Sequence, residues 1–309
     1  MNNSIFPVAV FFYNRPEHTL KCLNHLSECI DYQSFSFFFF SDAPRDVSHS
    51  ESVEAVRNLL KSQNKFFKAK LIFRESNYGL ARSIHDGVSS LCEEYGSVIV
   101  VEDDLRVLPD FLIFMRQSLL KYQSNDLIMQ IGGLPLIKPL DTSKDAFFLP
   151  LTTTWGWATW SRAWKYFSWT PADWPESLDD KRWLKLFDFS TSISYLSMLR
   201  DRFSGKNNSW GILWWYCVSR SGGLVLYSTY PKVLNDGFDG SGTHCGINPI
   251  FANQLASGTI QNDTSTVFNL PDKIAYKNND FYSVKLFLDN RPSSILHRLL
   301  RKISSVFNF

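Results

Sequence analysis

The chain has few cysteines, and their spacing excludes the sites that cysteine usually builds. Its 309 residues hold five, at positions 22, 29, 92, 217 and 245. An odd number without close pairs matches neither a disulfide framework nor a zinc site. This usage is typical of the reducing cytosol, so we expect a cytoplasmic protein.

Long hydrophobic runs are also missing. No stretch reaches the roughly 18 apolar residues that span a membrane. The N-terminus lacks a basic start, and Arg15 soon interrupts the first apolar run, which argues against a signal peptide. The net charge of +2 is too small to indicate a nucleic-acid partner, and we expect none.

Two glycine-rich nucleotide signatures are absent. Residues 6–13 form an apolar run, but no G-x-G-x-x-G follows it, and the chain contains no Walker sequence. These absences argue against a nicotinamide-dependent dehydrogenase and against a P-loop enzyme. The remainder is ordinary globular material, with 44% hydrophobic and 20% charged residues.

The first half of the chain alternates apolar runs with amphipathic stretches. This alternation predicts an α/β fold, with a mainly parallel sheet and helices on both faces. The predicted strands are residues 6–13, 35–40, 70–73, 98–101 and 127–131, and helices are predicted near 16–30, 53–60, 80–95 and 109–122. A later strand is predicted at 225–230.

Polar residues follow three of the predicted strands: Asn14-Arg15, Asp42 and Glu102-Asp103-Asp104. Ligands of such sheets bind beyond the carboxyl ends of the strands, so these residues predict one site. Three adjacent acids after a buried strand need water, cations or ligand hydroxyls, because unpaired buried charge is costly. One interpretation is a Mg²⁺ or Mn²⁺ ion with a phosphorylated substrate, and the other is a solvated acidic turn that caps the next helix.

The second half is rich in aromatic residues. All ten tryptophans lie between Trp155 and Trp215. Such rings build cores and also stack on sugars, so we expect most of them to pack in the core and a few to line an acceptor groove. Residues 235–244 are rich in glycine, and they either approach a phosphate or form an ordinary turn.

The chain resembles nucleotide-sugar-dependent glycosyltransferases of the GT-A fold, which is Rossmann-like. It is similar to bacterial family-two-like sugar transferases and to N-acetylglucosaminyltransferase I. The segments that carry the resemblance are Asn14-Arg15-Pro16, residues 77–83, residues 101–105 with Pro109-Asp110-Phe111, residues 155–160 and the loop 237–244. The resemblance implies an inverting transfer of a sugar from a nucleotide diphosphate, most simply a UDP-sugar, with Mn²⁺ or Mg²⁺ as cofactor.

The resemblance also implies roles for individual residues. Asp104 would bind the metal, with His244 as a second ligand. Donor contacts would come from five residues, with Glu102 and Asp103 on ribose or sugar hydroxyls, Asp42 on the base N–H, and Arg15 and Arg82 on the nucleotide or its phosphates. Guanidinium groups suit phosphates because they bind two oxygens at once.

Plainer interpretations of three of these residues stay open. Asp42 would cap a turn before Pro44. Arg82 would pair with Glu75 or Asp86 on the helix surface. His244 would be a hydrogen-bonded turn residue.

An inverting transfer needs a general base opposite the leaving group. The resemblance points to Asp179 and Asp180, in a segment that lacks the tryptophan expected directly before the acid pair. Asp239 is a further candidate. The other interpretation of Asp179 and Asp180 is a helix start before Lys181.

Three regions are expected. Residues 1–135 would bind the nucleotide sugar, 136–270 would form the catalytic, acceptor-side half of the same domain, and 271–309 would be a tail. In that tail, residues 295–307 place apolar and basic side chains on opposite sides, as in a helix that lies on an anionic membrane, a helix packed on its own domain or an oligomer contact.

We therefore expect a glycosyltransferase that builds a bacterial surface polysaccharide, with a glycan or lipid-linked oligosaccharide as acceptor. It could lie peripherally on the inner face of the cell membrane. Two rivals remain. A sugar nucleotidyltransferase would show a basic glycine-rich signature near its start, which residues 9–15 do not have. A glycan-binding protein would not need acids at the end of a strand.

Overall fold

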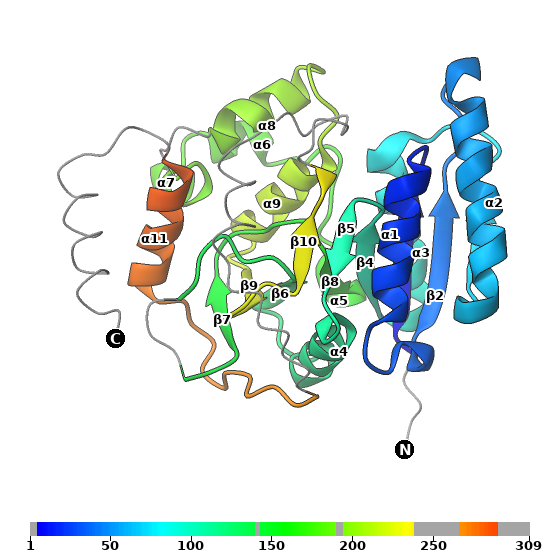
Figure 1. Cartoon of the computed structure of the whole chain (residues 1–309). Coiled ribbons are helices and arrows are strands. Elements are labelled where there is room, and N and C mark those ends of the chain that lie inside the picture. Colours follow the sequence, from blue (N-terminus) through cyan, green and yellow to red (C-terminus); the bar gives the residue numbers. More distant parts are fainter. Residues whose placement is uncertain (1–4, 140–142, 190–193, 238–265, 290–309) are drawn as a thin grey trace.

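A computed structural model describes residues 5–139, 143–189, 194–237 and 266–289. Its centre is an eight-stranded sheet with the strand order β3-β2-β1-β4-β8-β6-β9-β7, and β10 and β5 form a separate two-stranded ribbon (Figure 1). Within these ranges, no helix is long and apolar enough to cross a membrane.

The first half follows the predicted alternation closely. Its elements are β1 (Pro7–Phe12), α1 (Pro16–Ser27), η1 (Tyr32–Ser34), β2 (Ser36–Ser41), η2 (Val47–His49), α2 (Ser50–Phe67), β3 (Lys70–Phe73), α3 (Gly79–Tyr95), β4 (Ser97–Glu102), β5 (Leu105–Val107), α4 (Phe111–Lys121) and β6 (Ile128–Gly132). Local chemistry sets several ends. Pro16 occupies the first turn of α1, and Gly96 ends α3 in the left-handed conformation, with a φ of 80°.

The second half contains shorter elements. They are β7 (Ala146–Leu149), β8 (Trp157–Trp160), α5 (Ser161–Trp164), α6 (Trp174–Ser177), α7 (Lys181–Phe187), α8 (Tyr195–Phe203), α9 (Trp210–Arg220), β9 (Leu224–Ser228), β10 (Val233–Asn235) and α11 (Asn278–Leu288). Side chains of Asp180, Ser194 and Ser209 cap the first turns of α7, α8 and α9. Helix α11 is not among the predicted elements, and the predicted tail helix at 295–307 lies outside the described residues.

The sheet is mainly parallel, as predicted. Strands β3, β2, β1 and β4 pair in parallel, and so do β6 and β9. Strand β8 is antiparallel to both β4 and β6, which gives those two strands the same direction. Strand β7 runs antiparallel to β9 at one edge. Six strands therefore share one direction, and their carboxyl ends lie on one side of the molecule.

Helices cover both faces of the sheet. Alternate residues of β1 show this, because Val8 and Val10 belong to one hydrophobic cluster, whereas Ala9 and Phe11 belong to another. The first cluster includes residues from α1, α2 and α4, and the second includes residues from α3 and α9. This two-sided burial is the reason for the unbroken apolar runs of the inner strands.

Most tryptophans pack in the core, as predicted. The buried ones are Trp157, Trp160, Trp164, Trp183, Trp210, Trp214 and Trp215. Trp155, Trp169 and Trp174 are half-buried. Six of the seven buried tryptophans belong to the hydrophobic cluster that includes α3 and α9, and Trp160 belongs to the cluster on the other face. The division of the chain at residues 135 and 270 stays a prediction, and strands from both sides of residue 135 pair within the one sheet.

Candidate functional site

The acidic triplet lies where β1 and β4 end side by side. The two strands are parallel neighbours, and Phe11 of β1 pairs with Glu102 of β4. The loop after β1 therefore brings Arg15 onto the acids. Arg15 donates to Asp103 and, from Nη2, to Asp104 Oδ2 across 3.1 Å. The predicted grouping of Arg15 with the triplet is present in the structure.

The electrostatics of the triplet show a shortage of positive charge. Burial, together with the charges of Asp104 and Asp103, outweighs the opposing charge of Arg15 and raises the pKa of Glu102 to about 8. Burial also raises the pKa of Asp103, against the opposing effect of Arg15. For Arg15 itself, burial opposes the charged form, but the two aspartates outweigh it and raise the pKa. A further cation at this edge of the sheet would be favoured.

The chemistry of these donors fits a hard divalent cation. The described part of the chain holds no group of three or more histidine, cysteine, aspartate or glutamate side chains arranged as metal ligands. Mg²⁺ and comparable ions need fewer, because they bind through one or two carboxylates and take their other oxygens from water and substrate phosphates. The Asp104 side chain is 15% exposed, so a cation can reach it. His244 lies outside the described residues, as does Asp239.

The segment after β10 packs onto Asp104. The backbone N–H of Asp236 donates to the Asp104 carbonyl across 2.9 Å. Gly237 lies so close that a Cβ there would collide with Asp104 Oδ2. The start of the predicted glycine-rich loop therefore supports the acid, and glycine at 237 leaves room for its carboxylate. The rest of this loop, from residue 238, lies outside the described residues.

Asp42 lies at the end of β2 and binds the start of α3. Its Oδ1 accepts the backbone N–H groups of Ala43 and Tyr78, and its Oδ2 accepts those of Tyr78 and Gly79, at 2.8–3.1 Å. The side chain is buried. Asp42 therefore ties the start of α3 to the end of β2, and its contact with a base N–H stays a prediction.

Arg82 lies on the ring of Tyr78, with its guanidinium carbon 4.1 Å from the ring centroid. The alternative partner Asp86 is bound by Arg74, which also packs on Tyr78 at 4.6 Å. Among the described residues, no carboxylate forms an ion pair with Arg82. The surface-pair interpretation of Arg82 is thus replaced by stacking, which leaves its N–H groups available.

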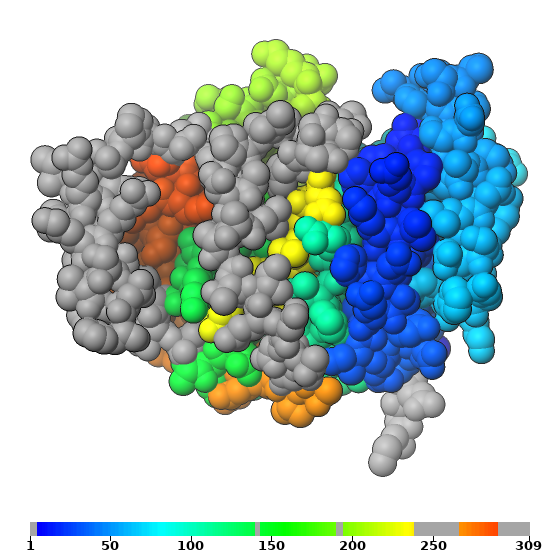
Figure 2. All heavy atoms as spheres, viewed as in Figure 1, coloured from blue at the N-terminus to red at the C-terminus, as the bar shows by residue number. Residues whose placement is uncertain are grey.

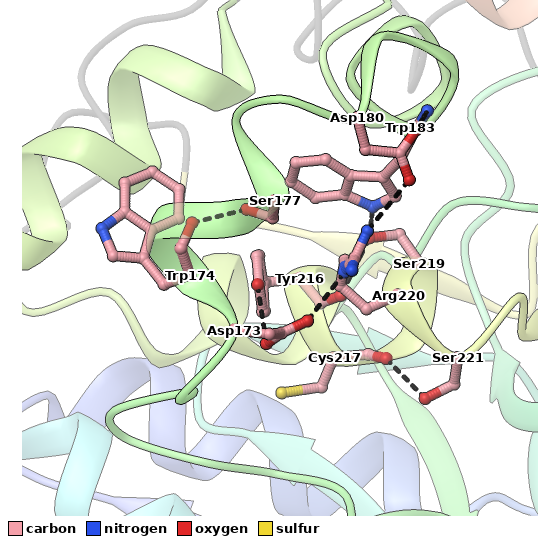
Figure 3. Close-up of polar contacts among 10 residues, drawn as sticks. All are labelled: Asp173, Trp174, Ser177, Asp180, Trp183, Tyr216, Cys217, Ser219, Arg220 and Ser221. Atoms are coloured by element: carbon pink, nitrogen blue, oxygen red, sulfur yellow. Dashed lines mark hydrogen bonds and ion pairs between the residues drawn. The ribbon is translucent and has the colours of Figure 1, made fainter.

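Asp179 and Asp180 lie at the start of α7. Asp180 accepts the backbone N–H of Trp183 at 2.9 Å and an N–H of Arg220 at 3.2 Å, and these contacts lower its pKa. Figure 3 shows Arg220 joining Asp180 to Asp173, which also accepts the hydroxyl hydrogen of Tyr216. Asp180 therefore caps the start of α7, as the helix-start interpretation predicted. Within the described residues, no hydrogen bond or ion pair joins Asp179 or Asp180 to the triplet.

Sequence reasoning missed Tyr78 and the Arg106–Asp236 pair. Arg106 Nε lies 2.8 Å from Asp236 Oδ1, and it joins β5 to the segment after β10. The available signals were the position of Tyr78 within the recognised segment 77–83 and the Asn-Asp-Gly sequence at 235–237. The Arg106–Asp236 contact joins residues 130 positions apart, so its partner could not be predicted. Tyr78 and Arg82 are four positions apart, and that helical spacing is a signal that could have indicated their contact. His85, by contrast, lies among the rings of Trp164, Phe167 and Trp169.

Comparisons with known proteins give distant structural similarity. No family model matches the chain, and no curated protein matches it. Similar solved structures include TarS from S. aureus, with 12% identity and a TM-score of 0.43 over 84% of this chain and 41% of TarS. GalNAc-T7, solved with UDP, GalNAc and Mn²⁺, shows 12% identity and a TM-score of 0.45 over 74% of this chain and 42% of that one.

A mannosyltransferase from Pyrobaculum calidifontis, solved in complex with GDP-Man and Mn²⁺, is also similar. It shows 16% identity and a TM-score of 0.31 over 42% of this chain and 35% of that one. The chain thus matches less than half the length of each of these three proteins.

Proposed function

We propose that the chain is a metal-dependent, inverting glycosyltransferase that moves a sugar from a nucleotide diphosphate to a glycan acceptor. The observation that supports this most directly is the acidic triplet at the end of β4, where burial and mutual repulsion raise the pKa of Glu102 and Asp103 although Arg15 is present. A site that is short of positive charge suits a cation together with a diphosphate.

The residues of the chain divide the work as follows. Asp104 would hold the divalent cation, which supplies positive charge for the departing nucleoside diphosphate. Arg15 orients Asp103 and Asp104 through its hydrogen bonds. Glu102 and Asp103 would accept hydrogen bonds from ribose or sugar hydroxyls. The transition state has oxocarbenium character, as in glycoside hydrolysis.

The nucleotide would lie along the ends of β1, β2 and β3. Asp42 would accept the base N–H there, beside its bonds to Tyr78 and Gly79. Arg82, stacked on Tyr78, would donate to the nucleotide or its phosphates. UDP is the nucleotide that we propose for the donor.

We propose that the general base is Asp179 or Asp180. It takes the proton from the acceptor hydroxyl as that oxygen attacks the anomeric carbon. A lowered pKa weakens Asp180 in this role, and its oxygens already accept from Trp183 and Arg220. Asp179 is exposed, and its side chain has no hydrogen-bonding partner among the described residues. Asp179→Asn should therefore lower donor turnover more than Asp180→Asn does.

Titration calorimetry with UDP, in the presence and absence of MnCl₂, tests the proposed function. We expect Mn²⁺ to increase the affinity for UDP, and Asp104→Asn to abolish that increase while the far-ultraviolet circular dichroism stays unchanged. Asp126→Asn is the matched control, because Asp126 is exposed and precedes β6, at the opposite edge of the sheet. Wild-type UDP affinity that does not respond to Mn²⁺ would refute the proposal.

We infer further that the acceptor belongs to a bacterial surface polysaccharide or a similar glycan, free or lipid-linked, at the cytoplasmic face of the membrane. The basic amphipathic sequence of residues 295–307 supports this. Co-sedimentation with phosphatidylglycerol vesicles should require that segment. Equal binding of a chain shortened after residue 289 would contradict membrane contact through this helix.

A further inference from the structure

A polar cleft opens between helix α1 and the β5–β10 ribbon, which neighbour each other on the face shown in Figure 2. Its volume is about 550 Å³. His18, Lys21 and His25 line the side formed by α1, and Arg106 and Asp236 line the other. Positions 18, 21 and 25 follow the spacing of three to four residues that places side chains on one face of a helix.

The cleft borders the acidic site. Four residues of the cleft, His18, Lys21, Arg106 and Asp236, also border a tight recess beside Asp103 and Asp104, which has no room for a water molecule. A ligand in the cleft would therefore have one end beside Asp104 and the other end along α1.

Two cationic side chains, Lys21 and Arg106, and one carboxylate, Asp236, line the cleft. The carboxylate of Asp236 is bound by Arg106. Asp103 and Asp104 share the single guanidinium of Arg15, so the end of the cleft beside them stays acidic and the outer end beside Lys21 is the one that favours an anion. Lys21 is exposed and forms no ion pair with the described residues, so its positive charge is uncompensated. The imidazoles of His18 and His25 lie on the same wall, and His25 Nδ1 is 3.4 Å from the carboxylate of Glu28.

We propose that this cleft binds an oxyanion of the acceptor substrate, a phosphate or a carboxylate, with Lys21 as its main cationic contact. The inference rests on the proposed function, because a sugar transfer at Asp104 requires the acceptor hydroxyl to lie near that residue. An acceptor held by its charged group along α1 extends from the cleft toward Asp104. The donor diphosphate would be held separately, by Arg15 and by the cation that Asp104 would bind.

Three small probes identify the chemistry of the ligand: glucose 1-phosphate, glucuronate and uncharged glucose. The full-length protein carries ¹³C-labelled histidine, and the ring signals of His18 and His25 report binding. We expect at least one anion to shift both signals and glucose to shift neither. Lys21→Met should weaken anion binding roughly tenfold, because it removes a hydrogen bond between charged groups.

Two further variants make the test specific. Lys21→Arg should restore most of the anion affinity, because it keeps the positive charge. Lys65→Met makes the same change on an exposed lysine of α2 and should leave the affinity unchanged. Preference for glucose 1-phosphate would assign the site to a phosphate, and preference for glucuronate would assign it to an acidic sugar.

The result that overturns the proposal is anion binding that Lys21→Met does not weaken, or no binding of either anion. Displacement of the anion by UDP with Mn²⁺ would also overturn it, because the cleft would then belong to the donor site. A wild-type protein that binds no UDP would refute the proposed function instead. Lys21-dependent anion binding in that protein would still support an oxyanion site in the cleft.

Discussion

Arg15 donates a hydrogen bond to Asp104 across 3.1 Å, although the two residues are 89 positions apart in the sequence. The contact exists because β1 and β4 are parallel neighbours and end at the same edge of the sheet. Arg15 also contacts the buried Asp103, so one guanidinium serves two carboxylates. One guanidinium cannot neutralise both carboxylates, and the remaining negative charge makes this edge of the sheet suitable for a cation together with a diphosphate.

Gly237→Ala should weaken Mn²⁺-dependent UDP binding. A Cβ at this position would collide with Asp104 Oδ2 and lie 3.0 Å from Asn235 Oδ1, so the Asp104 carboxylate must move. We expect the affinity, measured by calorimetry, to fall at least roughly tenfold, which corresponds to about 1.4 kcal/mol.

Gly211→Ala is the control for this change. A Cβ at Gly211 would meet only Thr154, at an ordinary 3.5 Å, and alanine suits helix α9. Equal UDP affinity in the Gly237→Ala and wild-type proteins would show that the Asp104 carboxylate does not hold the cation on which UDP binding depends.

Lys232→Met should strongly destabilise the fold. Lys232 and Asp110 form an ion pair in which the side chains are 6% and 2% exposed. The substitution removes the positive charge that faces the buried Asp110 carboxylate, and breaking such a buried pair costs about 3–5 kcal/mol in free energy of unfolding. Urea denaturation followed by tryptophan fluorescence measures this cost.

The exposed pair of Lys121 and Asp272 provides the comparison, since the Asp272 side chain is 81% exposed. Lys121→Met should change the free energy of unfolding by about 1 kcal/mol or less. Similar losses for Lys121→Met and Lys232→Met would contradict the role of burial.

His85 should make the fold less stable in mild acid. Burial lowers the pKa of His85 below its ordinary 6.5, against the opposing charge of Asp86. Below pH 6.5 the unfolded chain binds a proton that the folded chain does not, so stability falls as the pH drops from about 6.5 to the lower pKa of the folded state. Thermal unfolding between pH 7.5 and 5 should show this fall, and His85→Phe should reduce it.

If the stability of the His85→Phe variant fell with pH as steeply as that of the wild type, the pH dependence would belong to other groups. A steeper loss in the variant would show that the rings of Trp164, Phe167 and Trp169 stabilise the charged imidazole, which would contradict the lowered pKa.

Tyr78→Leu should weaken UDP binding by roughly two- to fivefold, since an exposed cation–π contact contributes about 0.5–1 kcal/mol. The ring of Tyr78 holds the Arg82 guanidinium at 4.1 Å. Tyr78→Phe keeps the ring and should retain the wild-type affinity. Tyr166→Leu removes an exposed ring under Lys165 and serves as the control. Wild-type UDP affinity in the Tyr78→Leu variant would contradict a role for the Tyr78–Arg82 contact in nucleotide binding.

Much of the first half could be predicted because its signals are local. The apolar run at 70–73 matches β3 at both ends, and the predicted strands at 6–13 and 98–101 lie within one residue of β1 and β4. Each inner strand is buried on both faces, and the continuous apolar run reflects that directly. The placement of β8 between β4 and β6, antiparallel to both, had no such signal.

The partners of the site residues were less predictable. Asp86 was a candidate partner for Arg82, one turn away on the same helix, but the structure pairs it with Arg74, which follows β3. Asp42 binds backbone groups 36 and 37 positions later. Spacing along a helix describes only neighbours in the same element, whereas these contacts depend on how the elements pack.

The sequence alone determined which side chains follow each strand, because strand and helix periodicity is written in neighbouring residues. It thereby placed Arg15, Asp42 and the acidic triplet at strand ends. Only the tertiary structure decided which of these ends adjoin, that Arg15 lies between Asp103 and Asp104, and that seven tryptophans are buried. Strand order and register arise from the joint packing of both sheet faces, and that packing sums contacts between residues far apart in the chain.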